Sequence, residues 1–514
     1  MAARISHGSP SESVKTICAA STSAPDLCAT RAPDAPNAPA AATVSAPPLT
    51  APQHSPNRDT LKQRVLRAGG WSLGGHVLSQ AIRLGSNLLM TRLLMPEAFG
   101  LMAIVIVMMV GFTLFSDIGI SQNIVRSPRG EEPIFLNTAW TLQILRGIFI
   151  WVLATAAAAA LPVAVGFGWI RAGTVYADPL LPWVISAYSL TLVIAGFTST
   201  KQAVARRHMR ARALTHIEIT TQIVSLVVTV ALAWWTHSIW SLVIGALLSS
   251  LIGCLLGHLF LPGFANKLAW DRTALQDLFG FGKWVFLSSI VGFMVVNGDR
   301  LILGGAVDAQ LLGIYTIAFL LVNVVQTMIS LVSGSVVFPA LCEVALHRPH
   351  DLSATANKFQ RYSDMFIMTA SGFLMISGSS IVSLLYDDRY RDAGLMLSAL
   401  AVGTIGLRYQ VVEQCYLALG KPQISTITNG CRWIALYFGL PISFHFWGFY
   451  GALVAIVLSQ FAGWPAAIFF KIRYGLMDVI VELLAVPPLV VGLLLGFSFR
   501  LIAPSHQALR SLLL

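Results

Sequence analysis

Long unbroken apolar runs, separated by short polar segments, fill most of the chain from residue 67 onward. A helix needs about 20 apolar residues to cross the hydrocarbon core of a bilayer, which is roughly 30 Å thick. Only helices and closed barrels satisfy every backbone polar group there, and these runs lack the alternation of polar and apolar residues that barrel strands show. Just 11% of the 514 residues are charged, against about 25% in soluble domains. The sequence therefore predicts an all-α integral membrane protein.

The apolar runs divide into thirteen expected membrane spans. They lie at 67–94, 100–125, 134–167, 180–201, 215–236, 239–263, 279–304, 309–341, 362–386, 393–419, 423–444, 448–470 and 477–503. The final LRSLLL resembles the beginning of a further span, so we expect 12 to 14 transmembrane helices in total.

The first 60 residues differ in composition from all that follows. They are rich in Ala, Pro, Ser and Thr, a composition that buries too little apolar surface to offset the entropy lost on ordering. They also lack the apolar core and small-residue cleavage site of a secretory signal. We expect residues 1–60 to form a disordered cytoplasmic tail.

A short pattern occurs twice in the apolar part of the chain. Arg92-Leu93-Leu94 ends the first span, and Arg300-Leu301-Ile302 ends the seventh; Gly100-Leu101 and Gly313-Ile314 follow them. Transporters are often built from such internal repeats, with the substrate path between them. We therefore expect two pseudo-symmetric six-helix bundles, at 61–265 and 266–475, and an extra C-terminal transmembrane helix at 476–514.

Lysine and arginine are concentrated in alternate loops, and basic loops mark the cytoplasmic side of a membrane. One set of loops holds twenty of them, whereas the opposite set, before the last span, holds only Arg171, Arg389 and Arg391. The twenty are Arg58, Lys62, Arg64, Arg67, Arg126, Arg129, Lys201, Arg206, Arg207, Arg210, Arg212, Lys267, Arg272, Lys283, Arg348, Lys358, Arg361, Lys421, Lys471 and Arg473. This bias predicts a cytoplasmic N-terminus, and the densest cluster, at 206–212, is suited to contact anionic membrane lipids.

Several classes of function are not supported by the sequence. The net charge of +11 does not indicate nucleic-acid binding, because the basic residues form short clusters between spans rather than one polar face. The six cysteines have no CxxC or zinc-ligand spacing. Neither the phosphate-binding GxxxxGKS/T pattern nor the zinc-binding HExxH pattern occurs. We expect a transporter rather than an enzyme, without a cofactor, a metal or a nucleic-acid partner.

The first span carries a polar stripe. His76, Gln80, Arg83, Asn87 and Thr91 recur at intervals of three or four residues, which places them on one face of a helix. An ionisable side chain within a span is costly and usually faces a water-filled cavity or a partner. The stripe predicts that this helix lines a cavity. The alternative is that its polar groups hydrogen-bond to neighbouring helices and hold the bundle together.

Further charges lie within the second and third spans. They are Asp117 and Arg146. A buried charge needs a partner in any protein, so Asp117 is equally compatible with a structural ion pair to Arg83 or Arg146 and with a role in transport.

The second half of the chain has its own charges within spans. Arg408 and Glu413 lie in the tenth span, and Arg408 occupies the second half as Arg83 occupies the first. Asp299 and Arg300 lie near the outer end of the seventh span. Their position predicts either a role in a gate or in the fold, or an ion pair at the membrane interface whose side chains reach the headgroups.

Short motifs accompany these polar residues in both halves. They are Arg92-Leu93-Leu94, Pro96-Glu97-Ala98-Phe99-Gly100-Leu101, Asp117-Ile118-Gly119, Asp299-Arg300-Leu301-Ile302-Leu303-Gly304, Leu312-Gly313-Ile314-Tyr315, Phe338-Pro339-Ala340-Leu341 and Leu419-Gly420-Lys421. As a set they resemble the Wzx-type polysaccharide transporters, the flippase branch of the superfamily that includes multidrug exporters of the MATE type and lipid II flippases. The resemblance extends from about residue 61 to 475, whereas the long tail and the missing fourteenth span depart from the family pattern.

The resemblance implies a flippase. Members of this family move an undecaprenyl-diphosphate-linked oligosaccharide from the cytoplasmic to the periplasmic leaflet of the bacterial inner membrane, without ATP. The implied role is exopolysaccharide or lipopolysaccharide biosynthesis, with membrane lipids, a polysaccharide polymerase and export proteins as further partners.

An anionic substrate of this kind needs a cationic, hydrogen-bonding cavity. We expect Arg83, Arg146 and Arg408 to contact the diphosphate or acidic sugars, since a guanidinium is planar and permanently charged. His76, Gln80 and Asn87, with their neutral polar groups, would contact sugar hydroxyls.

Three carboxylates are available to couple transport to proton or sodium entry: Asp117, Asp299 and Glu413. One charge that moves through 100 mV contributes about 2.3 kcal/mol.

Two other functions remain as alternatives. A MATE-type multidrug or cation antiporter has the same architecture, but its cavity would favour carboxylates over arginines. A membrane polysaccharide polymerase or glycosyltransferase would need a large outer loop, and the acidic loop segment Asp387-Asp388-Arg389 is short. A structural scaffold of an export complex would have no need for the polar stripe.

Overall fold

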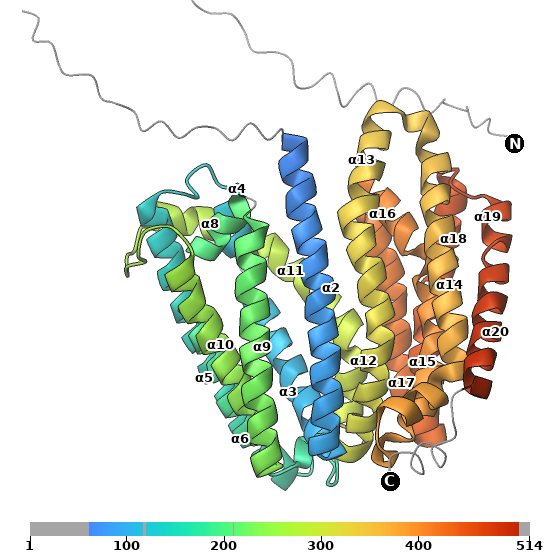
Figure 1. Cartoon of the computed structure of the whole chain (residues 1–514), viewed down its shortest axis with the longest axis horizontal. Helices are drawn as coiled ribbons and strands as arrows, with labels where there is room; N and C mark the ends of the chain where they lie inside the picture. The colour runs from blue at the N-terminus through green and yellow to red at the C-terminus, as the bar shows by residue number, and fades with distance from the viewer. Residues whose placement is uncertain (1–60, 117–119, 209, 503–514) are drawn as a thin grey trace, which may run out of the picture. The chain divides into compact units, whose positions relative to one another are not determined.

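Each of the predicted spans falls on helical backbone (Figure 1). The computed structural model describes residues 61–116, 120–208 and 210–502, all of which belong to one unit, Asp59–Leu514. Within these residues the regular structure is helical, without strands. The predicted tail at 1–60, Asp117 and the residues after 502 lie outside the described residues, so the predictions for them stay predictions.

The first half of the chain forms helices that largely follow the hydropathy. They are α2 (Leu61–Leu93), α3 (Pro96–Phe115), α4 (Ile120–Arg126), α5 (Pro133–Gly166), the 3-10 turn η1 (Val175–Ala177), α6 (Leu181–Tyr188), α7 (Leu190–Gly196), α8 (Lys201–Arg207), α9 (Ala211–Thr236) and α10 (Trp240–Phe260). The predicted span at 100–125 is divided, because α3 ends at Phe115 and Ser116 has a non-helical backbone. The span at 180–201 ends in a bend of 63° between α7 and α8.

The second half contains longer helices with local irregularities. They are α11 (Arg272–Gly304), α12 (Ala309–Val332), the π-helical turn η2 (Ser333–Val337), α13 (Phe338–His347), η3 (Pro349–Asp351), α14 (Leu352–Leu385), η4 (Asp388–Tyr390), α15 (Ala393–Thr404), η5 (Ile405–Tyr409), α16 (Gln410–Ala418), α17 (Pro422–Phe461), α18 (Trp464–Arg473), α19 (Val479–Leu483) and α20 (Val486–Ile502). Turns such as η2 and the 3-10 segment η5 often mark functional positions within helices.

Nine helical segments of the described chain are long and apolar enough to cross a membrane, or ten if α6–α7 and α8 form one bent span. One of them, Pro422–Arg473, has 52 residues, and a straight helix of that length would extend about 78 Å, far beyond a bilayer core. Gly448 interrupts it with φ 60°, a conformation that glycine adopts without steric cost. The predicted spans at 423–444 and 448–470 therefore lie on either side of a sharp bend, and the multi-pass membrane architecture is confirmed.

Local sequence determines where several helices begin. Asp271 and Asp308 precede α11 and α12, and each carboxylate accepts a hydrogen bond from a backbone amide of the first turn, at 2.9 and 2.8 Å. Such N-caps satisfy amides that have no partner within the helix. The pKa of Asp271 is lowered by the hydrogen bonds that Thr273 Oγ1 and the Ala274 amide donate to it. Proline occupies the first turn of α3, α5, α17 and α18, where its missing N–H costs nothing.

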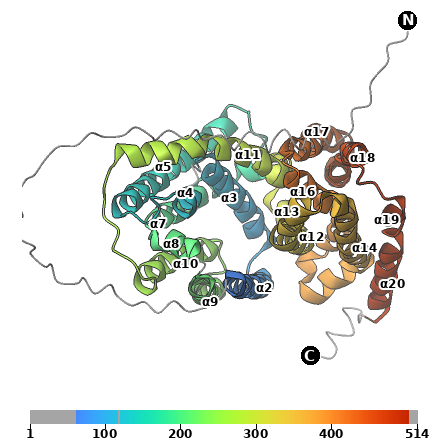
Figure 2. The same ribbon diagram turned by 90° about the horizontal axis from the view of Figure 1, so that it is seen from above.

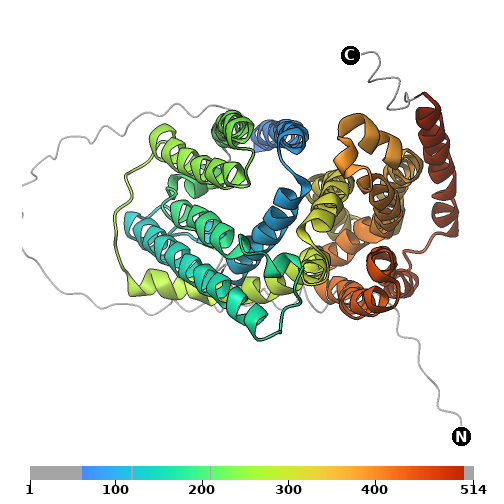
Figure 3. The same cartoon turned by 90° about the horizontal axis from the view of Figure 1, so that it is seen from below.

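The helices of the two halves gather in two groups, seen from opposite sides in Figures 2 and 3. Helices α5 and α7 to α10 lie on one side, α12 and α14 to α20 on the other, and α3 and α11 run between them. Helix α11 begins beside the first group, where the Asp271 amide donates to Thr138 Oγ1 at 3.1 Å, and ends against α12. The pseudo-symmetry of two six-helix bundles and their bounds stay predictions.

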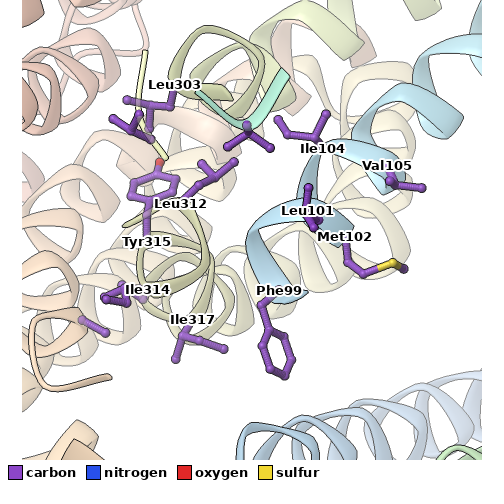
Figure 4. Close-up of a cluster of buried hydrophobic side chains, with 14 of the residues drawn as sticks. Phe99, Leu101, Met102, Ile104, Val105, Leu303, Leu312, Ile314, Tyr315 and Ile317 are labelled. Atoms are coloured by element: carbon purple, nitrogen blue, oxygen red, sulfur yellow. The ribbon is translucent and has the colours of Figure 1, made fainter. Parts of the chain in front are cut away.

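The two groups are joined through α3 and α12. Gly100 and Gly313 face each other so closely that a Cβ on either would collide with the backbone of the other helix. Around this contact lies the largest buried cluster of apolar side chains, shown in Figure 4, in which Phe99 and Ile104 of α3 lie near Leu312 and Ile317 of α12. Between helices in a bilayer, close van der Waals packing rather than the hydrophobic effect stabilises such a cluster, so this packing holds the halves together.

A second close contact attaches the last helix. Glycines 372 on α14 and 492 and 496 on α20 bring the two backbones together, and a Cβ at any of them would meet the opposite main chain. Small residues at such positions allow helices to approach closely in membranes. The predicted extra C-terminal helix is therefore packed directly on α14.

Candidate functional site

The first described helix is held in place by α9. Ser79, which is only 2% exposed, accepts a hydrogen bond from Gln222 Nε2 at 2.6 Å, and its own hydroxyl donates to Glu218 at 3.4 Å. Gly75 lies against Thr215, so small side chains allow α2 to approach α9. The Ser79 side chain, one position away from the predicted stripe, thus attaches the middle of α2 to α9.

The stripe itself has few protein partners. His76, Gln80, Arg83 and Asn87 form no hydrogen bond or ion pair with any residue in the described ranges. Arg83 is exposed, whereas His76 Nε2 and Asn87 Oδ1 are buried without a partner. Thr91 differs, because its hydroxyl donates to the Leu88 carbonyl at 3.0 Å.

Polar groups without partners are unusual in the interior of a protein. Leaving a buried donor or acceptor unsatisfied costs about 1–3 kcal/mol, and most such groups in native proteins are bonded to protein or water. The arrangement of α2 thus provides several hydrogen-bonding groups and one cation that water or a ligand can engage. Ser79, beside the stripe, forms a helix-to-helix hydrogen bond with Gln222, and both interpretations of the stripe itself stay predictions.

Arg146 on α5 contacts the end of α3. Its Nε donates to Ser116 Oγ at 3.0 Å and its Nη2 donates to the Thr113 carbonyl at 2.8 Å. The last carbonyls of a helix lack intrahelical partners and carry partial negative charge, so a guanidinium stabilises them. Arg146 is therefore already hydrogen-bonded to the end of α3. Its contact with substrate stays a prediction.

Asp299 lines a small cavity in the second half. The cavity has a volume of about 110 Å³ and its polar walls come from Asp299, Tyr315, Gln326, Thr404, Arg432 and Gln460. Asp299 is 5% exposed, and Tyr315 Oη donates to its Oδ2 at 2.5 Å. Its other oxygen, Oδ1, lies 3.7 Å from Arg300 Nε and makes no hydrogen bond. The carboxylate is thus buried in the fold, and its role in a gate or in an interfacial pair stays a prediction.

Glu413 lies behind the same cavity. Thr428 Oγ1 donates to it at 3.1 Å and Arg432 Nη2 lies at 3.8 Å. Since Arg432 also lines the cavity, a single guanidinium lies between Glu413 and the cavity that holds Asp299. The structure thus brings two of the three predicted ion-coupling residues to one region of the second half.

Arg408 belongs to a different region, which we call the four-charge network: Asp364, Arg408, Lys471 and Glu482. Arg408 Nη2 contacts Asp364 Oδ2 at 2.9 Å and Glu482 Oε2 at 2.8 Å. Its side chain is 8% exposed. Arg408 lies on η5 in the second half, whereas Arg83 and Arg146 lie on α2 and α5 in the first. The role of Arg408 as a substrate contact stays a prediction.

Lys471 completes the four-charge network. It is fully buried, and its Nζ donates to Glu482 Oε1 at 2.5 Å and to Gln360 Oε1 at 2.7 Å. Tyr409 Oη also donates to Glu482, at 3.1 Å. Two cations and two carboxylates thus neutralise one another among α14, η5, α18 and α19.

This network was missed by the sequence reasoning. Lys471 was assigned to a basic loop, and Asp364 and Glu482 were not singled out, although each is an acid inside or beside an apolar run. The available signal was Asp364, an acid within an apolar run, because a buried carboxylate needs a basic partner.

The two halves also meet at the end opposite to α4 and α8. Arg389 Nη2 donates to the carbonyls of Thr91 and Arg92, both at 3.3 Å, and to Asp387 at 2.7 Å. Tyr390 packs edge-to-face on Phe99 at 6.2 Å between ring centroids. The acidic loop segment at 387–389 therefore contacts the C-terminal end of α2.

A second contact at this end comes from η1. Tyr176 Oη donates to the Leu301 carbonyl at 2.8 Å and the Val175 amide donates to the Val307 carbonyl at 3.1 Å. Burial, with a smaller contribution from Tyr437, raises the pKa of Tyr176 to about 12, so the phenol remains a donor at neutral pH. The halves are joined here by backbone as well as side-chain contacts.

The fold and the polar residues within it define a class of protein. The chain is similar in structure to the lipid II flippase MurJ in an inward closed conformation, with a TM-score of 0.61 and 13% identity over 84% of this chain and 98% of that one. It is also similar to a MATE family multidrug resistance transporter of the MOP superfamily in its inward-facing conformation, with a TM-score of 0.57 and 15% identity over 77% of this chain and 94% of the transporter. The chain therefore has the fold of these membrane transporters.

The family follows from the sequence comparison. A family model described as "Polysaccharide biosynthesis protein" matches residues 89–394, and the chain belongs to this family. The resemblance noted from the short motifs is thereby confirmed.

Two curated relatives are similar to the chain. The lipopolysaccharide biosynthesis protein WzxC of Escherichia coli (strain K12) is 21% identical over 460 residues, which cover 86% of this chain and 89% of WzxC. The teichuronic acid biosynthesis protein TuaB of Bacillus subtilis (strain 168) is 22% identical over 295 residues, 56% of this chain. The chain spans only 58% of the length of TuaB.

Proposed function

We propose that this protein is a flippase that moves an undecaprenyl-diphosphate-linked oligosaccharide across the bacterial inner membrane, for exopolysaccharide or lipopolysaccharide biosynthesis. Membership in the polysaccharide biosynthesis family supports the substrate class, and the likeness to MurJ supports the mode of transport. The observation that carries the proposal is the stripe on α2, where Arg83 and three other polar side chains have no hydrogen bond or ion pair to a residue of the described ranges.

The stripe suits the chemistry of such a substrate. The diphosphate is anionic, and a guanidinium without a carboxylate partner retains its full attraction for phosphate oxygens. Of the three arginines, Arg83 is the one whose side chain has neither a hydrogen bond nor an ion pair to a described residue. His76, Gln80 and Asn87 offer donors and acceptors to sugar hydroxyls, while the isoprenoid tail stays in lipid.

We propose that Arg146 and Arg408 also contact the substrate, provided that their present bonds allow it. Both are already bonded to the protein, Arg146 to α3 and Arg408 to two carboxylates. A contact with substrate would have to add to these bonds or replace them in another conformation. Arg83 is therefore the first arginine to test.

Transport of this kind requires that the site open alternately to the two sides of the membrane. In this structure the halves are joined at the end where Arg389 and Tyr176 bond to the opposite half. We propose that these contacts break when the site opens to that side. Asp299 and Glu413, and Asp117 outside the described residues, are the proposed sites for a coupling ion.

The proposed orientation places the N-terminus in the cytoplasm, with the joined end facing the periplasm. The loops that carry most of the lysines and arginines lie at the other end, near α4, α8 and the connection of α13 to α14 (Figure 1). A polysaccharide polymerase and export proteins are the proposed partners on the periplasmic side.

The test is Arg83→Ala in a strain that lacks the chromosomal gene, with equal amounts of protein in the membrane. We expect polymer export to be abolished and the lipid-linked repeat units to remain on the cytoplasmic leaflet. Arg171→Ala, a change of an exposed arginine in an outer loop, is the matched control and should export normally. Full export by Arg83→Ala would contradict the cavity assignment.

Mass analysis of the lipid-linked oligosaccharides in the deletion strain tests the substrate class. Accumulation of complete repeat units is expected of a flippase. An unchanged lipid-linked pool together with a new sensitivity to cationic drugs would support the MATE-type antiporter instead, and accumulation of incomplete repeat units would support a glycosyltransferase.

A further inference from the structure

A large groove lies at the start of α14, on the flank of the second half. It has a volume of about 1050 Å³ and runs between the first turns of α14 and the segment that leads into α19. Helices α19 and α20 form the outer edge of the second half in both Figure 1 and Figure 2. The groove is thus distinct from the stripe on α2 and from the cavity at Asp299.

Three basic side chains line this groove. They are His350, Lys358 and Arg361, all exposed, and none has a hydrogen bond or ion pair from its side chain to a described residue. The one acid in the lining is Asp478. Its carboxylate already accepts a hydrogen bond of 2.9 Å from the Ile480 amide, as the N-cap of α19. The groove therefore presents unneutralised positive charge.

Asn357 gives an independent indication of a ligand. It lines the groove and is only 8% exposed, yet its amide makes no hydrogen bond within the described part of the chain. Buried side-chain amides are normally bonded to protein or to ordered water. Asn357 is nine-tenths buried as a residue, and its unbonded amide at the wall of a cationic groove is suited to an oxygen-rich ligand.

The walls of the groove are fixed by the protein. Ser353 Oγ donates to the Gly475 carbonyl at 3.1 Å and ties the first turn of α14 to the segment before α19. Directly behind, Lys471 and Glu482 of the four-charge network join α18 to α19. A preformed site loses less entropy on binding than one that must be ordered.

The remaining lining is apolar and lies toward the membrane. Tyr362, Met365 and Val479 are 62%, 61% and 63% exposed. Helix α14 has 34 residues, whereas about 20 suffice to cross the bilayer core, so its first turns extend to the level of the headgroups. Cations at this level, followed by exposed apolar side chains, match a lipid with an anionic head and acyl chains.

We infer that this groove binds an anionic glycerophospholipid, with the phosphodiester held by Lys358, Arg361 and Asn357 and the chains against Met365 and Val479. Basic pockets between transmembrane helices on the cytoplasmic side are known to hold such headgroups. The position on the outer flank, away from α2, favours a lipid of the surrounding bilayer over the transported one. The groove is a lipid site separate from the transport path.

The test uses the full-length protein in a neutral detergent with added phosphatidylglycerol, and the melting temperature as readout. We expect phosphatidylglycerol to raise the melting temperature by several degrees, because a ligand that binds only the folded state stabilises it. Phosphatidylcholine and inorganic phosphate should give no comparable shift. The same shift with phosphatidylcholine would overturn the inference, and so would a shift with inorganic phosphate alone.

Variants then assign the effect to the groove. Lys358→Gln with Arg361→Gln should lose most of the shift, whereas Arg171→Gln with Arg391→Gln, which removes the same charge at the opposite end, should retain it. Asn357→Leu should reduce the shift without lowering the melting temperature in detergent alone, because the amide has no protein partner to lose. An undiminished shift in the Lys358 and Arg361 double variant would overturn the site.

One further arm separates the two lipid sources. Undecaprenyl diphosphate, added in place of phosphatidylglycerol, should not compete at the groove. Its displacement of bound phosphatidylglycerol at equal or lower concentration would assign the groove to the transported lipid and overturn the choice of a bilayer lipid.

Discussion

Arg83 and Arg408 are both arginines within helices of mostly apolar sequence, but their surroundings differ completely. Arg408 contacts two carboxylates at 2.8 and 2.9 Å and its side chain is 8% exposed. Arg83 is exposed and has no partner in the described chain. A buried charge with partners serves the fold, whereas a charge left without them within a span remains available to a ligand. The partners of a charge therefore distinguish the two roles better than its position in a span.

Glu482→Gln should have the largest effect, because it leaves Arg408 and Lys471 facing Asp364 alone. Removing one partner of a buried ion pair costs about 3–5 kcal/mol. We expect a large fall in the melting temperature, measured by intrinsic tryptophan fluorescence in detergent. Glu343→Gln, on the exposed surface of α13, is the control and should melt like the wild type.

The double variant Glu482→Gln with Lys471→Met sharpens this result. It removes one charge of each sign and leaves the Arg408–Asp364 pair intact, so much of the lost stability should return. Equal melting temperatures for the single and double variants would show that charge balance is not what the four-charge network provides.

Two glutamines test the same comparison between partnered and unpartnered polar side chains, with an expected effect of intermediate size. Gln222 donates to Ser79 at 2.6 Å, and Gln222→Leu should lower the free energy of unfolding by about 1 kcal/mol. Gln80 has no such partner, and Gln80→Leu should leave it unchanged. Chemical denaturation of both variants, compared with their export activity, checks the pair. Greater destabilisation by Gln80→Leu would show that the stripe holds the bundle together.

Arg83→Met should have the smallest effect on stability. A side chain without partners contributes little to the fold, so the free energy of unfolding should change by no more than about 0.5 kcal/mol. Polymer export should nevertheless be lost. Arg408→Met is the companion variant, and it should show a clear loss of stability. If the two variants proved equally unstable, the distinction between the two arginines would fail.

The helices themselves could be located from hydropathy, because crossing a bilayer imposes a minimum length and composition on each run. Local breaks were harder to place. The bend at Gly448 within α17 separates two predicted spans without a polar loop, and the 3-10 segment η5 places Arg408 on a turn of different pitch from the helices around it. Such features depend on backbone geometry that hydropathy does not report.

The polar residues could be detected in the sequence but not paired. The spacing of His76, Gln80, Arg83 and Asn87 on one helix is local information, and the prediction of a stripe followed from it. The bond between Lys471 and Gln360 joins residues 111 positions apart, and it exists only because α14 and α18 pack together. Single-sequence reasoning therefore found the stripe and overlooked the four-charge network.

The same network has a consequence for the order of synthesis. Asp364, Arg408 and Lys471 leave the ribosome before Glu482, which follows Lys471 by 11 residues. At roughly 5–20 residues per second, synthesis of these 11 residues takes on the order of a second. During that time the nascent second half contains two cations and one carboxylate of the four-charge network. A chain terminated in this interval would carry Lys471 without its carboxylate partner.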